Sequence, residues 1–161
     1  MSALVIFDSG GCRFALRRDA VSRILPTPRL TRPPQAPGAL AGFFAFGPDV
    51  VTVLGFAALT GGAEENAPGL YDHVILLKGD GPLIALFVDR VFDVVEADEK
   101  SARPVASGGS HRDCIVATIT TRKGDVLLLD HARMIADYER DRVRHFHAAE
   151  RERRRSLGDA A

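Results

Sequence analysis

Four residues between positions 111 and 131 are of the types that build a thiol active site. A thiolate nucleophile needs a general base, and that base needs an acid that orients it. Cys114, His111, His131 and Asp130 would supply these groups. However, Asp130 and His131 are neighbours at the end of an expected strand, where successive side chains point to opposite faces of the sheet. We therefore predict that these residues are not catalytic and that the chain is not an enzyme.

Two further sets of residues are of metal-ligand types. His145 and His147 stand two positions apart in an expected helix, which places them about 200° apart around its axis, too far to share one ion. The acidic stretch 89–99 lacks the ligand pattern of a calcium loop and is typical of a strand edge followed by a turn. We predict neither a metal site nor a cofactor.

The cysteines give no sign of redox or disulfide chemistry. Cys12 and Cys114 are too few for a disulfide scaffold, and they form neither a Cys-x-x-Cys motif nor the spacing of a zinc finger. We predict that both are reduced and buried, as free cysteines commonly are. With 161 residues, of which 46% are hydrophobic, the chain is long enough to bury a core.

The charge balance argues against a polyanionic partner. The chain has 21 Lys and Arg against 21 Asp and Glu, so we expect no nucleic-acid binding. Residues 136–157 hold seven arginines against five acids, and the run 151–155 is typical of a solubilising helix end. There is no run of 18 apolar residues and no secretory leader pattern, so we expect no membrane insertion and a cytoplasmic protein.

The elements that must position any site are mostly strands. Short apolar runs rich in β-branched residues occupy residues 4–7, 14–16, 50–54, 74–77, 83–88, 91–95, 115–119 and 126–129. Glycine-containing turns join several of them as hairpins, at residues 9–13, 78–82 and 121–125. Many short strands with hardly a helix between them indicate an antiparallel barrel or sandwich and exclude a Rossmann or P-loop fold.

Other segments interrupt or follow the strand pattern. Residues 26–37 hold five prolines and cannot form a central strand, and residues 61–69 are polar and contain glycine. Residues 18–25 are compatible with a helical turn that places Val21, Ile24 and Leu25 on one face. From about residue 130 a helical stripe begins, which predicts a long C-terminal helix whose first two turns pack on the body.

The order of these segments resembles the CheW-like domain of bacterial chemotaxis coupling proteins. The resemblance covers residues 4–135. It is carried by Gly11-Cys12-Arg13-Phe14-Ala15-Leu16, Val21-Ser22-Arg23-Ile24, Ala36-Pro37, residues 40–48 and 50–56, residues 74–77, Ala85-Leu86-Phe87-Val88-Asp89-Arg90-Val91 and residues 124–130. The order and spacing of these segments carry the resemblance, and no single segment is diagnostic.

The resemblance implies a fold and a role. The fold would be mostly β, with two small five-stranded SH3-like barrels in a CheW-like domain at residues 1–135, followed by a C-terminal charged α-helix and tail at 136–161. Such domains are adaptors without catalytic activity. One surface meets the signalling tip of a chemoreceptor, and another meets a regulatory domain of a histidine kinase.

The chain departs from the family pattern where a partner contact is expected. Residues 45–48 read Ala-Phe-Gly-Pro where the family usually has Asn-Leu-Arg-Gly, and residues 52–57 have lost the usual Asp-Leu-Arg. Arg23 replaces an acidic residue. Loss of a guanidinium removes a bidentate partner for carboxylates, whereas Phe43, Phe44, Phe46 and Phe56 add large apolar side chains.

We therefore predict a partner-binding site that does not use the family's arginines. Its expected residues are Val21, Arg23, Ile24, Leu40, Gly42, Phe44, Phe46, Gly47 and Phe56. A second contact is expected at Tyr138, Arg142 and Phe146 on the C-terminal helix. The alternative is a CheW-like interaction protein of another regulatory pathway, which uses that helix to bind a partner or to dimerise. The sequence leaves the oligomeric state open.

Overall fold

The computed structural model describes residues 2–32, 40–59, 72–79, 81–105, 114–122, 124–136, 138–139 and 154–157. Its strands are β1 Ser2–Ser9, β2 Cys12–Arg17, β3 Val21–Pro26, β4 Leu40–Phe46, β5 Asp49–Gly55, β6 His73–Leu77, β7 Ile84–Val88, β8 Arg90–Ala97, β9 Arg103–Pro104, β10 Ile115–Thr121 and β11 Gly124–Leu129. The short helix α1 spans Phe56–Leu59, and single 3₁₀ turns occur at Arg18–Ala20 and Glu99–Ser101. The prediction of a mostly β fold is confirmed.

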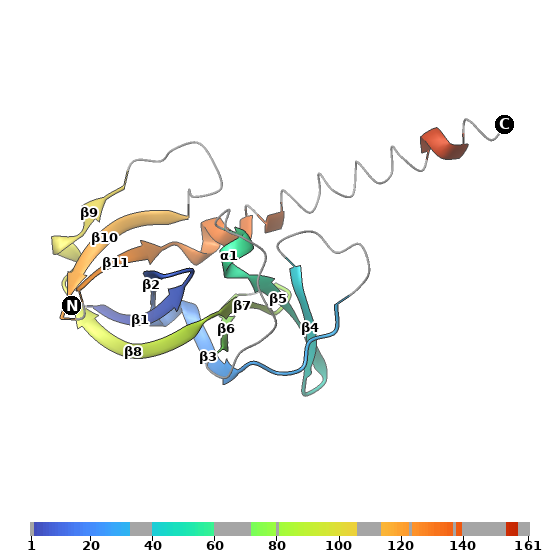
Figure 1. The fold of residues 1–161 in the computed structure, drawn as a ribbon, viewed down its shortest axis with the longest axis horizontal. Helices are drawn as coiled ribbons and strands as arrows, with labels where there is room; N and C mark the ends of the chain where they lie inside the picture. Colours follow the sequence, from blue (N-terminus) through green and yellow to red (C-terminus); the bar gives the residue numbers. More distant parts are fainter. Residues whose placement is uncertain are drawn as a thin grey trace.

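The strands form two sheets that lie side by side (Figure 1). One sheet has six strands in the order β8-β1-β2-β11-β10-β9, and the other has five in the order β3-β6-β7-β5-β4. The six-stranded sheet collects strands from both ends of the chain, whereas the five-stranded sheet uses only the middle. Helix α1 lies at the junction between them (Figure 1).

Both sheets follow one plan. In each, two antiparallel pairs meet at a parallel junction, β2 with β11 in one sheet and β7 with β5 in the other. The register shifts also correspond: β8 and β3 each carry an irregularity after their first residues, and so do β10 and β4. The isolated bridge between Thr31 and Phe43 occupies the place in the five-stranded sheet that β9 has in the other.

Three clusters of buried residues explain why strands such as β6 and β7 are apolar along almost their whole length. One cluster lies within the six-stranded sheet and includes Ile6 and Ile119, and a second lies within the five-stranded sheet and includes Val51 and Phe87. The third draws side chains from both sheets and includes Phe56. Since alternate residues of one strand face different clusters, both faces are buried and the sequence shows continuous apolar runs.

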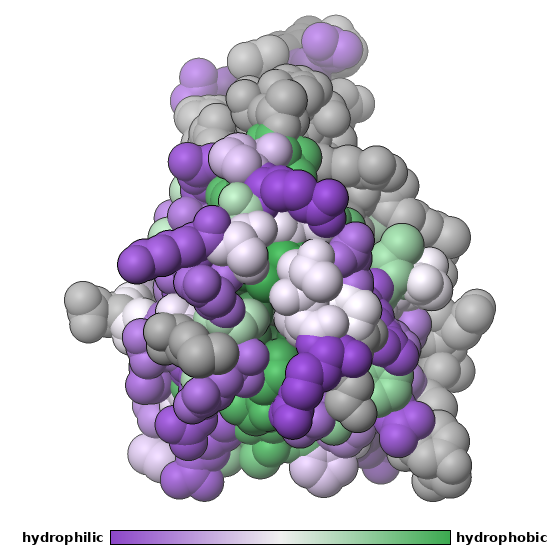
Figure 2. Space-filling view, turned by 90° about the vertical axis from the view of Figure 1, so that its left-hand side faces the viewer, coloured by the Kyte–Doolittle hydropathy of each residue, from purple (hydrophilic) through white to green (hydrophobic). Residues whose placement is uncertain are grey.

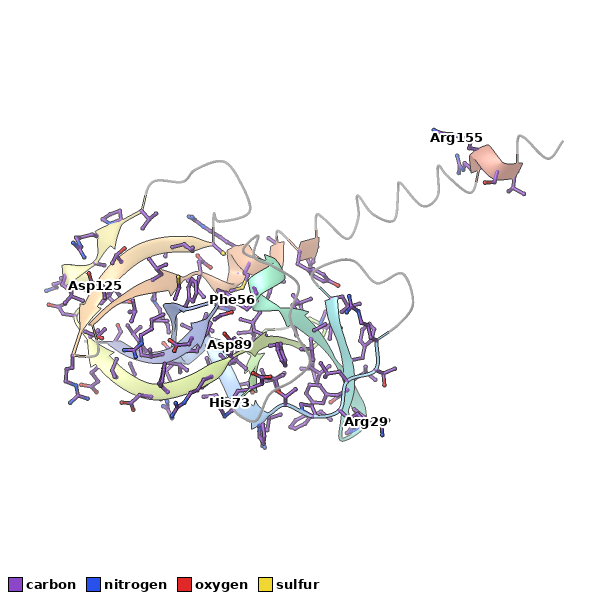
Figure 3. All side chains as sticks on the ribbon, in the orientation of Figure 1. Arg29, Phe56, His73, Asp89, Asp125 and Arg155 are labelled. Atoms are coloured by element: carbon purple, nitrogen blue, oxygen red, sulfur yellow. The ribbon has the colours of Figure 1, made fainter. Side chains whose placement is uncertain are left out.

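The chain crosses directly from one sheet to the other between β7 and β8. At the crossing, the Asp89 carboxylate accepts a hydrogen bond from Gly10 N at 3.0 Å, and Asp89 N donates to Asp8 O at 3.1 Å. Val91 N donates to Nδ1 of His73 at 3.2 Å, which ties β8 to β6 of the other sheet. Figure 3 shows Asp89 and His73 near the junction of the sheets. These contacts fix the crossing against both sheets.

Two details of strand geometry differ from the expectation. The sheets are not wholly antiparallel, because each contains one parallel pair. A parallel pair needs a long connection, and β2 to β11 and β5 to β7 are both distant in the chain. The sheets have six and five strands rather than five each, and the closure of each sheet into a barrel stays a prediction.

The expected helical turn at residues 18–25 is wrong after Ala20. Only Arg18–Ala20 form a 3₁₀ turn, and Val21–Pro26 form β3. The pairing of Val21 with Leu77 and of Arg23 with Leu76 leaves Ser22 as an extra residue, a β-bulge. The bulge breaks the alternation of the strand and so imitates a helical spacing.

The start of the predicted C-terminal helix packs on the body. Residues 131–136 and 138–139 are helical, and Met134 and Tyr138 lie in the cluster shared by both sheets. Residues 154–157 are also helical and exposed. The remainder of the predicted helix lies outside the described residues. The division into 1–135 and 136–161 stays a prediction.

Candidate partner-binding surface

Several of the predicted site residues belong to the core. Phe56 is fully buried, with its ring 5.1 Å from that of Phe7 and 4.7 Å from that of Phe14 between centroids. It therefore joins β1 and β2 to the end of β5, and Figure 3 shows it at the junction of the sheets. Leu40 and Phe44 are also buried, in two different clusters.

Two members of the predicted set, Arg23 and Phe46, meet between the end strands β3 and β4. The guanidinium of Arg23 lies 5.6 Å from the ring centroid of Phe46, and Phe46 packs edge to face on Phe44 at 6.4 Å. Val21 and Ile24 lie on the other face of β3, because their partners Leu77 and Ile75 belong to the shared cluster. Ile24 is 38% exposed there, and Val21 is half-buried. Among the described strands no backbone pairing joins β3 to β4. The contact between these two strands is therefore made by side chains. This group offers a cation beside apolar surface.

Gly42 permits the chain to cross the outer edge of β4. Thr31 and Phe43 exchange two backbone hydrogen bonds of 2.8 Å. A Cβ atom on Gly42 would lie 2.9 Å from Thr31 O and 3.0 Å from Leu30 Cβ, and its φ is +154°. The role of Gly42 is therefore close backbone approach. Gly47, with φ of +61°, forms the turn between β4 and β5.

Sequence reasoning missed the most exposed large hydrophobic residue of the β4–β5 hairpin, which lies on the face opposite Phe44 and Phe46. Val50 is 64% exposed and pairs across the hairpin with the exposed Ala45. The continuous run 50–54 gave no reason to separate Val50 from its buried neighbours. The one available signal was its position next to a two-residue turn, where a strand leaves the core.

The second predicted contact is only partly described. Tyr138 is buried in the shared cluster. Arg142 and Phe146 lie outside the described residues. Partner binding by both predicted sets stays a prediction.

The residues considered for chemistry have structural roles where they are described. Cys114 is buried, and Asp130 caps the C-terminal helix by accepting hydrogen bonds from Ala132 N at 3.0 Å and Arg133 N at 3.3 Å. Cys12 is exposed at the start of β2, so the prediction that both cysteines are buried is wrong for Cys12. A hairpin strand next to its turn leaves the core early, which explains the exposure.

The acidic stretch is engaged by protein groups. Asp98 accepts a hydrogen bond from Lys100 N, and Glu99 pairs with Arg17 at 2.6 Å. Within the described part of the chain, no group of three His, Cys, Asp or Glu residues is arranged to hold a metal ion. His111, His145 and His147 lie outside that part. Nor does any helix there have the length and apolar character to cross a membrane.

The outer end of the six-stranded sheet has a different surface. Figure 2 shows this end with hydrophobic residues in a narrow strip between hydrophilic ones. The exposed large hydrophobic residues of this sheet and of the chain just after β9 are Val94 and Val105. Ion pairs join Arg17 to Glu99 and Arg103 to Asp125, the latter at 3.3 Å. Here the charged groups are paired within the chain.

Comparison with known proteins agrees with the fold. A family model of the CheW-like domain matches residues 3–139. The crystal structure of the scaffolding protein TtCheW from Thermoanaerobacter tengcongensis superimposes with a TM-score of 0.72 and 17% identity, over 80% of this chain and 88% of that chain. A search of curated proteins finds no match. The family match covers most of the chain, and CheW-like domains are non-catalytic scaffolds, which confirms that the chain is not an enzyme. The protein is a member of the CheW-like domain family.

Proposed function

We propose that this protein is a cytoplasmic scaffold in chemotaxis-type signal transduction, which couples the signalling tip of a chemoreceptor to the regulatory domain of a histidine kinase. The observation that carries the proposal is the CheW-like domain over residues 3–139. Its partners are proteins, and the protein has neither a catalytic nor a nucleic-acid-binding role.

The surface between β3 and β4 supports one of these contacts. Arg23 is exposed on the end strand β3, and its guanidinium lies over the ring of Phe46. A cation placed over an aromatic ring is held in position yet keeps its charge toward solvent. The contact therefore favours a partner segment that combines apolar and acidic side chains.

Binding to purified partners tests the proposal. A receptor signalling tip and a kinase regulatory domain from the same genome are each immobilised, and binding of the full chain is measured by surface plasmon resonance. We expect binding to both. Absence of binding to both overturns the coupling role.

A pair of matched variants tests the surface. Arg23 and Arg13 each lie over an aromatic ring, 5.6 Å from Phe46 in the five-stranded sheet and 4.7 Å from Phe92 in the six-stranded sheet. Arg23→Gln should weaken one of the two interactions at least tenfold, about 1.4 kcal/mol. Arg13→Gln should leave both unchanged. If both variants weaken binding equally, the surface between β3 and β4 is not the partner contact.

A further inference from the structure

The β4–β5 hairpin of one sheet and the β10–β11 hairpin of the other correspond in register. Both hairpins have a two-residue turn, at residues 47–48 and 122–123. Next to the turn, Ala45 pairs with Val50 in one hairpin, and Thr120 pairs with Asp125 at the same place in the other. The equivalent positions therefore allow a direct comparison within one molecule.

The hairpin of the six-stranded sheet satisfies its own polar groups. Thr120 Oγ1 donates to Asp125 Oδ1 at 2.7 Å, and the Arg103 guanidinium reaches Asp125 Oδ2 at 3.3 Å. The hydroxyl, the carboxylate and the cation thus form a closed polar group on this face. Because its polar groups are already paired, this face would gain little binding free energy from a partner.

The hairpin of the five-stranded sheet has the opposite character. Val50 replaces the carboxylate and is 64% exposed, and Ala45 beside it is also exposed. Continuing the antiparallel register from the bridge between Thr31 and Phe43 places Arg29 level with Ala45. Figure 3 shows Arg29 beside β4 at the hairpin end.

Arg29 has no carboxylate counterion among the residues that the structure describes. Its side chain is exposed. In the other sheet the cation at this hairpin is Arg103, which pairs with Thr118 and so holds the register position of Thr31 rather than that of Arg29, and it does have such a carboxylate. The face made of Arg29, Ala45 and Val50 therefore lacks the acidic group that its equivalent contains.

We propose that the face of Arg29, Ala45 and Val50 docks an amphipathic helix of a partner protein whose apolar stripe is flanked by carboxylates. The partner's apolar side chains cover Val50 and Ala45, and its carboxylate pairs with Arg29 in the way that Asp125 pairs with Arg103. The proposal concerns a different face from the β3 and β4 surface and does not rest on chemotaxis coupling.

The geometry favours a helix on the face over a strand on the edge. The outer edge of β4 beside Phe43 is already occupied by the two backbone hydrogen bonds to Thr31, so strand addition is blocked there. Segment 27–32, β4 and β5 span about 10 Å at a strand spacing of roughly 4.8 Å. This width matches the diameter of a helix with its side chains, also about 10 Å.

A synthetic helix tests the proposal without knowledge of the natural partner. The probe is a helical peptide of about 15 residues with leucines spaced along one face and glutamates on both sides of them. It is titrated into the full chain labelled with ¹⁵N, and amide shifts are followed by NMR. We expect shifts centred on Ala45, Val50 and Arg29, and weaker binding at high salt because the contact with Arg29 is exposed.

Variants and a matched peptide make the outcome decisive. Val50→Asp and Arg29→Glu should each weaken binding at least tenfold, whereas Val105→Asp, which alters an exposed valine near the other sheet, should not. The same peptide with lysines in place of glutamates should bind at least tenfold more weakly. Shifts located elsewhere, equal binding of both peptides, or no binding overturns the proposal. A doubled molecular mass of the free protein that Val50→Asp abolishes also overturns it, because the occupant is then a second copy.

Discussion

At the scale of single residues, two features of the fold each depend on one residue. One is the close approach of a backbone segment to β4, and the other is the polar group at the β10–β11 hairpin. Gly42 lets segment 27–32 lie against β4 because it has no Cβ. Asp125 organises the tip of the six-stranded sheet because it accepts from both Thr120 and Arg103. These two residues act through different forces, and each leads to its own prediction.

Gly42→Ala should destabilise the protein by about 1–3 kcal/mol. The added Cβ would lie 2.9 Å from a backbone oxygen, which can move only with its whole segment. Denaturant unfolding measures the loss. Gly79→Ala is the control, because a Cβ there has no neighbour within 4 Å. Equal losses in the two variants would show that close approach is not the cause.

The pKa of Asp125 lies below its usual value of 3.8, chiefly because Thr120 donates a hydrogen bond to the carboxylate. Burial is the second cause and raises the pKa, and the nearby Arg103 lowers it further. Thr120→Val should raise this pKa more than Arg103→Gln does. A carboxyl titration by NMR measures both shifts. The reverse order would mean that the charge of Arg103 dominates.

The same lowered pKa makes a small part of the stability dependent on pH. A carboxyl whose pKa is lower in the folded state stabilises the fold above its unfolded value, near pH 4, and this contribution is lost as pH falls through the folded value. Asp125→Asn should therefore flatten the decline of unfolding free energy below pH 4. An unchanged slope would contradict this account.

At the scale of elements, one turn of helix joins the two sheets. Helix α1 directly continues β5 and turns Phe56 toward β1 and β2. The ring contacts are both edge to face, a favourable aromatic geometry. Through the ring of Phe56, the short helix connects the five-stranded sheet to β1 and β2 of the six-stranded sheet.

Phe56→Ala should destabilise the protein by about 3–5 kcal/mol, since it leaves a cavity in the shared cluster. Phe56→Leu should cost less because much of the volume is kept. Thermal and denaturant unfolding measure both. Val50→Ala, at an exposed position, should stay within about 0.5 kcal/mol of the parent protein. A small effect of Phe56→Ala would show that the cluster repacks.

Elements also mark where sequence reasoning succeeds and fails. Hairpin turns were predictable because glycine at the turn has a physical reason: Gly10 and Gly11 both adopt positive φ. β3 was mistaken in part for a helical turn because the bulge at Ser22 shifts its alternation. Burial of Phe56 and exposure of Val50 depend on which strand faces the other sheet, and neither local spacing nor composition contains that information.

At the scale of the whole molecule, the shared cluster couples the two sheets. It contains Phe7 and Leu16 of one sheet and Leu54 and Leu86 of the other. Neither sheet can lose its structure without exposing this surface. The burial of apolar area therefore favours unfolding as one unit.

Native-state hydrogen exchange checks this expectation. The slowest amides of β2 and β11 should report the same free energy of opening as those of β5 and β7, within about 1 kcal/mol. Far-UV circular dichroism should follow a single transition. Protection that persists in one sheet after it is lost in the other would separate the sheets into independent units.

The parallel junction of β2 with β11 also has a consequence for synthesis of the chain. β2 ends at Arg17, and its neighbour β11 begins only at Gly124. At roughly 5–20 residues per second, a ribosome leaves the edge of β2 without its final neighbour for about 5–20 s. By the end of that time all strands of the five-stranded sheet, which lie between Val21 and Val88, have been synthesised. The newly made protein must therefore keep its first hairpin from pairing with other chains until its last hairpin arrives.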